Sequence, residues 1–392
     1  MLQPHLRPGD IRPWMMETLL PFWADVGVDR ECGGFVERLS LDRRPAPDDY
    51  KRVRAQARQI YVFSHAHLLG APEWALDAVH HGVAFLTERC WDRIHGGWYH
   101  QVTRTGAPLD VRKDTYDHAF VLFAMAWLHR ATGNPAALDW ARRTIAFLDD
   151  RLGDPTGGGY WEAVSPDGAT DRLPRRQNPH MHLLEAFIAL HEATGDADWL
   201  DRARAMVGLF QDRFFDADTG SLREYFTADW RPAPGADGRI REPGHHFEWF
   251  WLLHHYRRLT GDDSVLDPAE ALLFFAMKHG IDELTEGVPV AFDAVGADGT
   301  VLAGTKRLWP QTEAVKAHLA RYEFAHGAPP EPDPLSARLH LLTMFGEYID
   351  LDHGVWHDQL ARDGTPVTEY IPSSTLYHLV LCLAEASRLL RD

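Results

Sequence analysis

The feature of this sequence that most constrains its fold is a motif that returns six times. Glycine-centred stretches read ECGGFVERL, IHGGWYHQV, PTGGGYWEAV, DTGSLREYF, TEGVPVAFD and DHGVWHDQL. Their glycines are spaced by 63, 62, 61, 67 and 67 residues and lie at Gly34, Gly97, Gly159, Gly220, Gly287 and Gly354. The short alternating run after each glycine predicts a brief strand or hairpin. A period of this kind indicates one supersecondary unit repeated six times.

A second phrase supplies the helices of each unit. LHRATGNPAALDWARRTIAFLDDRL, from Leu128, resembles LHEATGDADWLDRARAMVGLFQDRF, from Leu190. Looser copies surround Gly70, Gly261 and Gly327. Apolar residues recur at helical spacing on both sides of each glycine, which predicts a helix, a left-handed glycine C-cap and a second helix. Six such units make twelve helices.

Twelve paired helices could form an open solenoid or a closed ring. A solenoid would need polar caps at its ends. Here the first helix, expected at about residues 9–26, can instead pair with the last, expected at about residues 373–390. That pairing completes the sixth unit and favours an all-α fold, an (α/α)6 barrel with short β-hairpin insertions. We expect residues 1–392 to be a single catalytic domain.

Composition and charge disfavour several classes of partner. The chain has 40 basic and 57 acidic residues, a formal charge of −17, which disfavours nucleic acid and anionic membranes. No stretch approaches the ~20 apolar residues of a membrane span, and the N-terminus lacks a signal-peptide pattern. Three unpaired cysteines suit a reducing compartment. These features predict a cytoplasmic protein, a monomer or homodimer, that acts on a small molecule.

Alternate helices should line the inside of the ring, and their first turns carry ionisable residues in apolar surroundings. In PGHHFEWFWLL, Glu248 would be an unpaired buried carboxylate unless other helices supplied partners. We expect these to be Arg58 and a histidine, with His245 on the same helix face. One residue from each inner helix, at intervals of 60, 64, 66, 65 and 65, gives the candidate site Arg58, His118, His182, Glu248, Glu313 and His378.

Any one of these residues could be structural, since a lone helical histidine is usually a hydrogen-bonded core residue and a glutamate a salt-bridge partner. Their shared phase is what indicates a site. No zinc, phosphate-loop, dinucleotide or serine-nucleophile motif is present, and an arginine sits poorly beside a cation, so we expect no metal and no cofactor. Histidine is suited to acid–base catalysis near neutral pH.

The remaining chemistry is proton transfer next to a carbonyl, as in aldose–ketose isomerisation or epimerisation at C2 of a sugar. Arg58 would stabilise the oxyanion, and Trp98, Trp309 and Tyr116 could pack on sugar rings. A glycoside hydrolase on the same barrel, with Glu248 and a second glutamate as acid and base, stays open. So does a non-catalytic sugar-binding barrel.

Six blocks, in order and over nearly the whole chain, resemble the N-acylglucosamine 2-epimerase superfamily: ARQIYVFS, YDHAFVL, NPHMHLLEA, PGHHFEWFWLL, WPQTEA and IPSSTLYH. The resemblance implies an (α/α)6 barrel. It implies that His378 and His245 are the catalytic histidines, with Glu248 beside His245. It further implies a substrate-binding set of Arg58, Asn178, His182, Trp309 and Glu313, to which YDHAFVL adds Tyr116 and His118.

The block EYIPSSTLYHL resembles the mannose isomerase group more than the N-acylglucosamine epimerases. The resemblance therefore implies metal-independent interconversion of D-mannose and D-fructose through a cis-enediol(ate). His378 would be the base at C2, His245 would assist ring opening, and Glu248 would hold His245. A sugar 2-epimerase of the mannose/glucose or N-acylglucosamine type and a sulfoquinovose isomerase remain alternatives.

Overall fold

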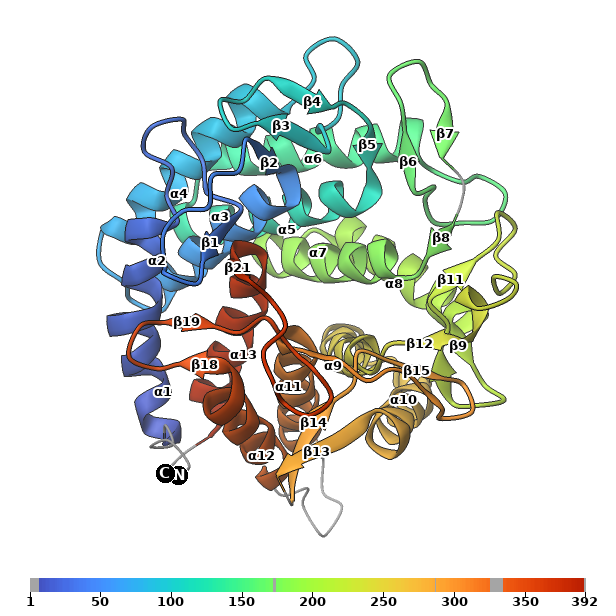
Figure 1. Ribbon diagram of the computed structural model, residues 1–392. Helices are drawn as coiled ribbons and strands as arrows, with labels where there is room; N and C mark the ends of the chain where they lie inside the picture. The colour runs from blue at the N-terminus through green and yellow to red at the C-terminus, as the bar shows by residue number, and fades with distance from the viewer. Residues whose placement is uncertain (1–6, 172–173, 286, 325–333, 391–392) are drawn as a thin grey trace.

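Six helices surround the axis of a ring in the computed structural model, which describes residues 7–171, 174–285, 287–324 and 334–390. They are α3 (Val53–Leu68), α5 (Thr115–Thr132), α7 (Asn178–Thr194), α9 (Pro243–Thr260), α11 (Leu308–Phe324) and α13 (Leu376–Leu389). Each contacts the next, and α13 contacts α3, so the ring closes (Figure 1). The expected (α/α)6 barrel is confirmed.

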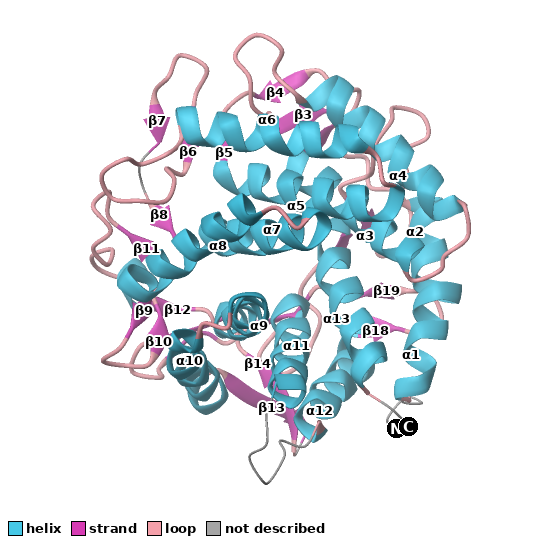
Figure 2. Ribbon diagram, turned by 180° about the vertical axis from the view of Figure 1, so that it is seen from behind, coloured by secondary structure: helices cyan, strands magenta, loops and turns pink. Residues whose placement is uncertain are grey.

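An outer layer of helices covers this ring. Its members are α1 (Pro8–Trp14) and α2 (Leu20–Val26), joined by a π-helical turn, α4 (Trp74–Phe85), α6 (Pro135–Arg151), α8 (Ala197–Leu209), α10 (Leu266–His279) and α12 (Leu335–Thr343). Each of α4 to α12 packs on the inner helix before it in the chain, and α1 packs on α13 (Figure 2). The predicted pairing of the first and last helices is confirmed. No helix within the described ranges is long and apolar enough to span a bilayer.

Short antiparallel strands stitch neighbouring units together at the end where the inner helices begin. The inter-unit sheets are β1 (Arg38–Ser40) with β21 (Tyr370–Pro372); β2 (Tyr50–Arg52) with β3 (Gln101–Thr103) and β4 (Pro108–Asp110); β5 (Lys113–Asp114) with β6 (Ala163–Val164) and β7 (Thr170–Asp171); β8 (Arg175–Arg176) with β11 (Tyr225–Phe226); β12 (Ile240–Arg241) with β15 (Ala294–Gly296) and β16 (Val301–Ala303); and β17 (Lys306–Arg307) with β20 (Gln359–Leu360). The β1–β21 pair joins the two ends of the chain.

The remaining strands form hairpins around the repeated glycines. They are β9 (Phe215–Asp216) with β10 (Ser221–Leu222), β13 (Ile281–Thr285) with β14 (Val288–Ala291), and β18 (Ile349–Asp350) with β19 (Val355–Trp356). All six repeated glycines have φ between 65° and 77°, a backbone region that favours glycine, which explains the motif. The expected left-handed C-caps are found at Gly133, Gly195 and Gly261. Gly70 follows the cap residue Leu69, and Gly327 lies outside the described residues.

In five of the six units, a backbone N–H of the hairpin donates a hydrogen bond to a side chain in the first turn of the next inner helix. The N–H groups of Phe35, Trp98, Tyr160 and Leu222 donate over 2.7, 3.0, 2.9 and 2.9 Å to the side chains of Gln56, His118, His180 and His246. In the fifth unit the N–H of Ala291 donates to Gln311 over 2.7 Å. A glutamine or histidine in the first turn of an inner helix is therefore a structural acceptor that recurs around the ring.

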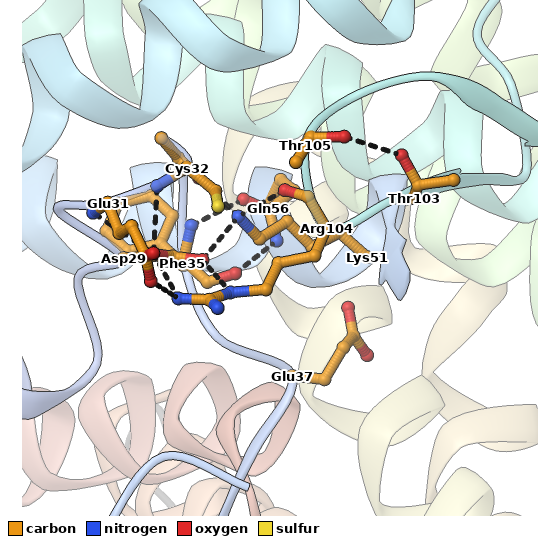
Figure 3. A network of polar contacts seen from close by, with 12 residues as sticks. Asp29, Glu31, Cys32, Phe35, Glu37, Lys51, Gln56, Thr103, Arg104 and Thr105 are labelled. Carbon is orange, nitrogen blue, oxygen red and sulfur yellow. Dashed lines mark hydrogen bonds and ion pairs between the residues drawn. The ribbon is translucent and has the colours of Figure 1, made fainter. Parts of the chain in front are cut away.

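Buried ion pairs fix a cationic residue two or three positions before each of five inner helices. Lys51 pairs with Asp29 over 2.9 Å, and Arg104 reaches the same carboxylate from the neighbouring unit (Figure 3). The equivalent pairs are Lys113–Asp92, Arg175–Asp154, Arg241–Asp216 and Lys306–Asp282, at 2.7 to 3.2 Å. Each cation is almost completely buried, so it depends on its carboxylate.

Candidate active site

Two histidines, each held by a carboxylate, define the site at the N-terminal ends of the inner helices. His378 in the first turn of α13 contacts Glu313 of α11, with 2.8 Å between Nδ1 and Oε1. His245 in the first turn of α9 contacts Glu224, just before β11, with 2.9 Å between Nδ1 and Oε2. A carboxylate on Nδ1 fixes the orientation of an imidazole and leaves Nε2 for another partner.

The surroundings drive the two histidines toward opposite charge states. Burial lowers the pKa of His378 to about 4, although Glu313 opposes this. Burial also disfavours the charged form of His245, but the carboxylates of Glu224 and Glu242 outweigh it and raise its pKa to about 9. At neutral pH His378 is a free base and His245 a protonated acid. Titratable groups whose pKa values are driven apart in this way are the mark of an acid–base pair.

Trp309 and Asn178 complete the surroundings of these rings. The Trp309 ring lies 5.0 Å from that of His245 and 5.6 Å from that of His378, measured between centroids. Gly244 makes room for it, because a Cβ there would lie 2.5 Å from the indole. Asn178 Nδ2 lies 3.2 Å from His245 Nε2. A protonated His245 donates from Nε2, so we assign the otherwise unpartnered amide oxygen of Asn178 to this contact.

Arg58 supplies a guanidinium without a carboxylate partner in the described part of the chain. Its Nη2 donates to the hydroxyl of Tyr116 over 2.9 Å and its Nη1 to the carbonyl of Ser374 over 3.4 Å. The guanidinium lies over the Phe120 ring at 4.0 Å, and its Nε has no partner. Such a cation is free to stabilise a negative oxygen on a substrate.

Glu248 has different neighbours from those expected. It hydrogen-bonds neither Arg58 nor His245; among the described residues its ion-pair contact is with His182 Nδ1, at 3.9 Å. Both of its oxygens are buried without a hydrogen-bond partner among the described residues. Burial, and then the nearby charge of Glu313, raise the pKa of this carboxyl well above its usual range. The expectation that Glu248 holds His245 is wrong, because Glu224 occupies that position.

His182 lies beside the site and is oriented by Glu185, one turn further along α7. Its Nδ1 lies 3.0 Å from Glu185, which also accepts a hydrogen bond from the Tyr377 hydroxyl. The ring packs on Phe120 and Tyr116. Glu313 is fully buried behind His378, so it acts through that ring and not by touching a substrate.

His118 does not belong to the site. It is the structural acceptor for the N–H of Trp98, and its Nδ1 contacts the carbonyl of Asp114 over 2.7 Å. The expected set was out of register by two residues at this helix: Phe120 is the equivalent of Arg58 and His182, with intervals of 62 on each side. Trp98 is likewise fully buried against Trp91 and Trp140 and lies away from the site.

Glu224 is the residue of the site that was missed, although the sequence carries a signal for it. Each of the six glycine motifs holds an acidic residue or a histidine three to six residues after its glycine: Glu37, His100, Glu162, Glu224, Asp293 and Asp358. Four of these accept a backbone N–H at the start of an inner helix, at 2.6 to 3.3 Å. The repeat therefore places Glu224 at the ring mouth, where it also reaches His245.

Three triads at the site have donor spacing compatible with a metal ion: His182–Glu185–Glu248, Glu248–Glu313–His378 and Glu224–Glu242–His245. The ammonium of Lys316, 2.6 Å from Glu313, already supplies positive charge to the triad that contains Glu313.

A cavity of about 340 Å³ opens at the opposite end of the inner helices, lined by Trp127 and by salt-bridged arginines and glutamates. The paired histidines lie at the other end, which is therefore the catalytic one.

Comparison with known proteins places this architecture. The model of the N-acylglucosamine 2-epimerase (GlcNAc 2-epimerase) family matches residues 33–382. The chain belongs to the N-acylglucosamine 2-epimerase family. It is 35% identical to a mannose-6-phosphate isomerase of Rhizobium meliloti (strain 1021), covering 97% of each chain. It is 31% identical to a D-mannose isomerase of Pseudomonas cannabina pv. alisalensis, covering 84% of each chain.

The fold of this family member matches solved structures over its length. Cellobiose 2-epimerase from Spirochaeta thermophila DSM 6192 superposes with a TM-score of 0.85 at 26% identity, covering 97% of this chain and 96% of the other. Family and relatives are isomerases and epimerases, so the protein is an enzyme of the isomerase class.

Proposed function

We propose that this enzyme interconverts D-mannose and D-fructose by acid–base catalysis without a metal ion. The observation that carries the proposal is the pair of carboxylate-held histidines with opposite charge states, His378 neutral and His245 protonated. Isomerisation needs one base that removes the C2 proton and one acid that protonates an oxygen. The names of the two relatives described above support the choice of mannose.

The proposed reaction starts with ring opening, in which His245 gives a proton to the ring oxygen and takes up the proton of the O1 hydroxyl as the C1 carbonyl forms. His378 then removes the C2 proton of the open-chain aldose, and the C2–H electrons form the C1–C2 double bond of a cis-enediol(ate). Arg58 stabilises the negative O1, for which its guanidinium has no competing carboxylate. Return of the proton to C1 by His378, as the C2 hydroxyl passes its proton to O1 and becomes a carbonyl, gives the open-chain ketose and restores His378 as the free base.

Charge at the mouth of the ring supports an uncharged sugar over a phosphate ester. Four arginines lie at or just before the start of inner helices, and each is ion-paired within 3.1 Å: Arg52 with Glu37, Arg54 with Asp117, Arg176 with Glu162 and Arg307 with Asp293. A phosphate is bound by cations that are free to contact it. Here the free guanidinium is Arg58, which the reaction itself requires.

The test is a panel of sugars with product analysis by NMR. D-mannose should give D-fructose, while mannose 6-phosphate, sulfoquinovose and cellobiose should react far more slowly. Glucose as the early product from mannose would show that the proton returns to C2 and that the enzyme is a 2-epimerase. A preference for the phosphate ester would overturn the assignment of an uncharged substrate.

We further propose that residues 1–392 form one catalytic domain and that the enzyme acts in the cytoplasm as a monomer or homodimer, without nucleic acid or membrane partners. Inter-unit strands around the whole ring, including the β1–β21 pair between its ends, support the single domain. Three free cysteines, two of them buried, support a reducing compartment.

A further inference from the structure

One helical turn below the histidines lies a layer of six buried side chains, four of them uncharged. Its members are equivalent positions of the six inner helices, at intervals of 62, 62, 66, 65 and 65: Tyr61, Phe123, Glu185, Trp251, Lys316 and Leu381. Lys316 is fully buried, and its Nζ lies over the Trp251 ring at 4.3 Å. A buried ammonium is costly unless it is paired, so its position calls for an explanation.

Lys316 is paired with a carboxylate that itself holds the base. Its Nζ lies 2.6 Å from Oε2 of Glu313, while Oε1 of the same carboxylate lies 2.8 Å from Nδ1 of His378. The three groups form a line from the buried layer to the imidazole of His378. The ammonium of Lys316 beside Oε2 favours the ionised form of Glu313. An ionised Glu313 accepts a hydrogen bond from Nδ1–H of His378.

The surrounding carboxylates favour a charged Lys316, and the ionised state of Glu313 depends on that charge. Glu185 and Glu248 also act on Lys316, and together with Glu313 they hold the pKa of the lysine above its usual value despite burial. The pKa of Glu313 is kept below normal, against burial, by Lys316 and then by His378. Without the ammonium, Glu248 and Glu313 would face each other with one cation fewer.

We propose that Lys316 is a positioning residue for the isomerisation: it holds the carboxylate of Glu313 that fixes the tautomer of His378, and its own charge favours the unprotonated form of that ring. The proposal rests on the proposed function in assigning His378 as the base. Lys316 itself touches no reacting atom. Its cationic charge acts on His378 both directly and by holding the carboxylate in place.

The groups that face His378 come from five helices. Glu313 and Lys316 of α11 and Arg58 of α3 are charged, and burial and then these groups set its pKa. Tyr377 precedes it on α13, with its ring 4.6 Å away. From α9 and α7, Glu248 and the His182–Glu185 pair border the same space. Of the two cations in this set, Lys316 is the one in contact with Glu313.

The experiment removes the charge and measures His378 directly. Lys316→Met and Lys316→Gln should raise the pKa of His378 by about one pH unit, because a neighbouring cation disfavours the protonated ring. The readouts are the histidine titration followed by NMR, with the His378 signal assigned by its absence in His378→Asn, and the acid limb of the kcat–pH profile. Lys316→Gln keeps a polar side chain beside Glu313 without the charge and serves if methionine prevents folding. Lys316→Arg keeps the charge and should leave the titration and the acid limb unchanged.

Lys51→Met is the matched control. Lys51 is also buried and lies 2.9 Å from Asp29 (Figure 3). Its Nζ lies over the Phe85 ring at 4.6 Å. It belongs to the buried ion pair before α3 and has no contact with His378 among those described. It should lower thermal stability without moving the acid limb. A charge-removing Lys316 variant whose His378 titration stays at the wild-type position would overturn the proposal. A shifted His378 titration in a protein that isomerises no sugar would support the Lys316 inference and refute the proposed function.

Discussion

At the scale of single residues, the site depends on how each carboxylate is shared. Glu224 and Glu313 each place one oxygen against the Nδ1 atom of a histidine, yet His245 is protonated and His378 is neutral. The difference lies in the third group: Glu242 adds negative charge near His245, whereas Lys316 and Arg58 add positive charge near His378. Acid and base are thus assigned by neighbours and not by the histidines themselves.

Glu224→Gln tests the assignment of the acid. The amide removes a negative charge beside His245, so the pKa of that ring should fall from about 9 and the basic limb of the kcat–pH profile should move to lower pH. At pH 8 the loss of the protonated form should lower kcat by up to ~10²-fold. Glu162→Gln, which changes the equivalent carboxylate in the preceding unit, paired with Arg176, is the control and should leave the basic limb in place. An unmoved limb in Glu224→Gln would mean that another group is the acid.

His118→Gln tests the corrected register. Glutamine already plays the same acceptor role at Gln56 and Gln311, so this variant should keep both kcat/KM and thermal stability. His118→Ala leaves the buried N–H of Trp98 unpaired and should cost about 1–3 kcal/mol of unfolding free energy while kcat/KM is retained. Chemical denaturation and steady-state kinetics check both variants. A stable His118→Gln with poor kcat/KM would return His118 to the substrate site.

At the scale of elements, the hairpin of a unit and the next inner helix are held together by the same two contacts in several units. A glycine turn presents a backbone N–H to the helix, and a buried cation before the helix pairs with an aspartate at the start of the turn. The sequence predicted the hairpins and the helices, because glycine and apolar periodicity are local signals. It did not separate the structural acceptors from the site residues, since histidines at positions two residues apart look alike in one sequence. Comparing intervals around the ring, 62 and 62 for Phe120 against 60 and 64 for His118, would have separated them.

Arg175→Met tests how much the buried ion pair before an inner helix contributes to stability. Arg175 is fully buried, lies 2.7 Å from Asp154 and is stacked on Trp230 at 3.6 Å. Its removal leaves Asp154 buried and unpaired and should lower the free energy of unfolding by about 3–5 kcal/mol. Arg204→Met, in an exposed pair with Asp201, should cost less than about 1 kcal/mol. Equal losses in the two variants, measured by denaturant titration, would show that the buried ion pair contributes nothing special.

At the scale of the whole molecule, near-sixfold repetition is what lets one sequence build an asymmetric site. Equivalent positions of six helices meet at the ring mouth, so a different side chain in each unit gives Arg58, Phe120, His182, Glu248, Glu313 and His378 at one level. Fold and the level of the site followed from the repeat spacing. The partners of Glu248 and His245 did not, because they depend on which neighbouring unit reaches across, and Glu224 comes from a hairpin.

The most direct measurement of the central claim is isomerisation of D-mannose in D2O with EDTA, followed by NMR. Proton transfer through His378 exposes the transferred proton to solvent, so fructose should carry deuterium at C1, and EDTA should not slow the reaction. His378→Asn should abolish both the product and the label. Fructose formed without any deuterium, in a reaction that EDTA stops, would contradict the account, since that result is the mark of a metal-assisted hydride shift between C2 and C1.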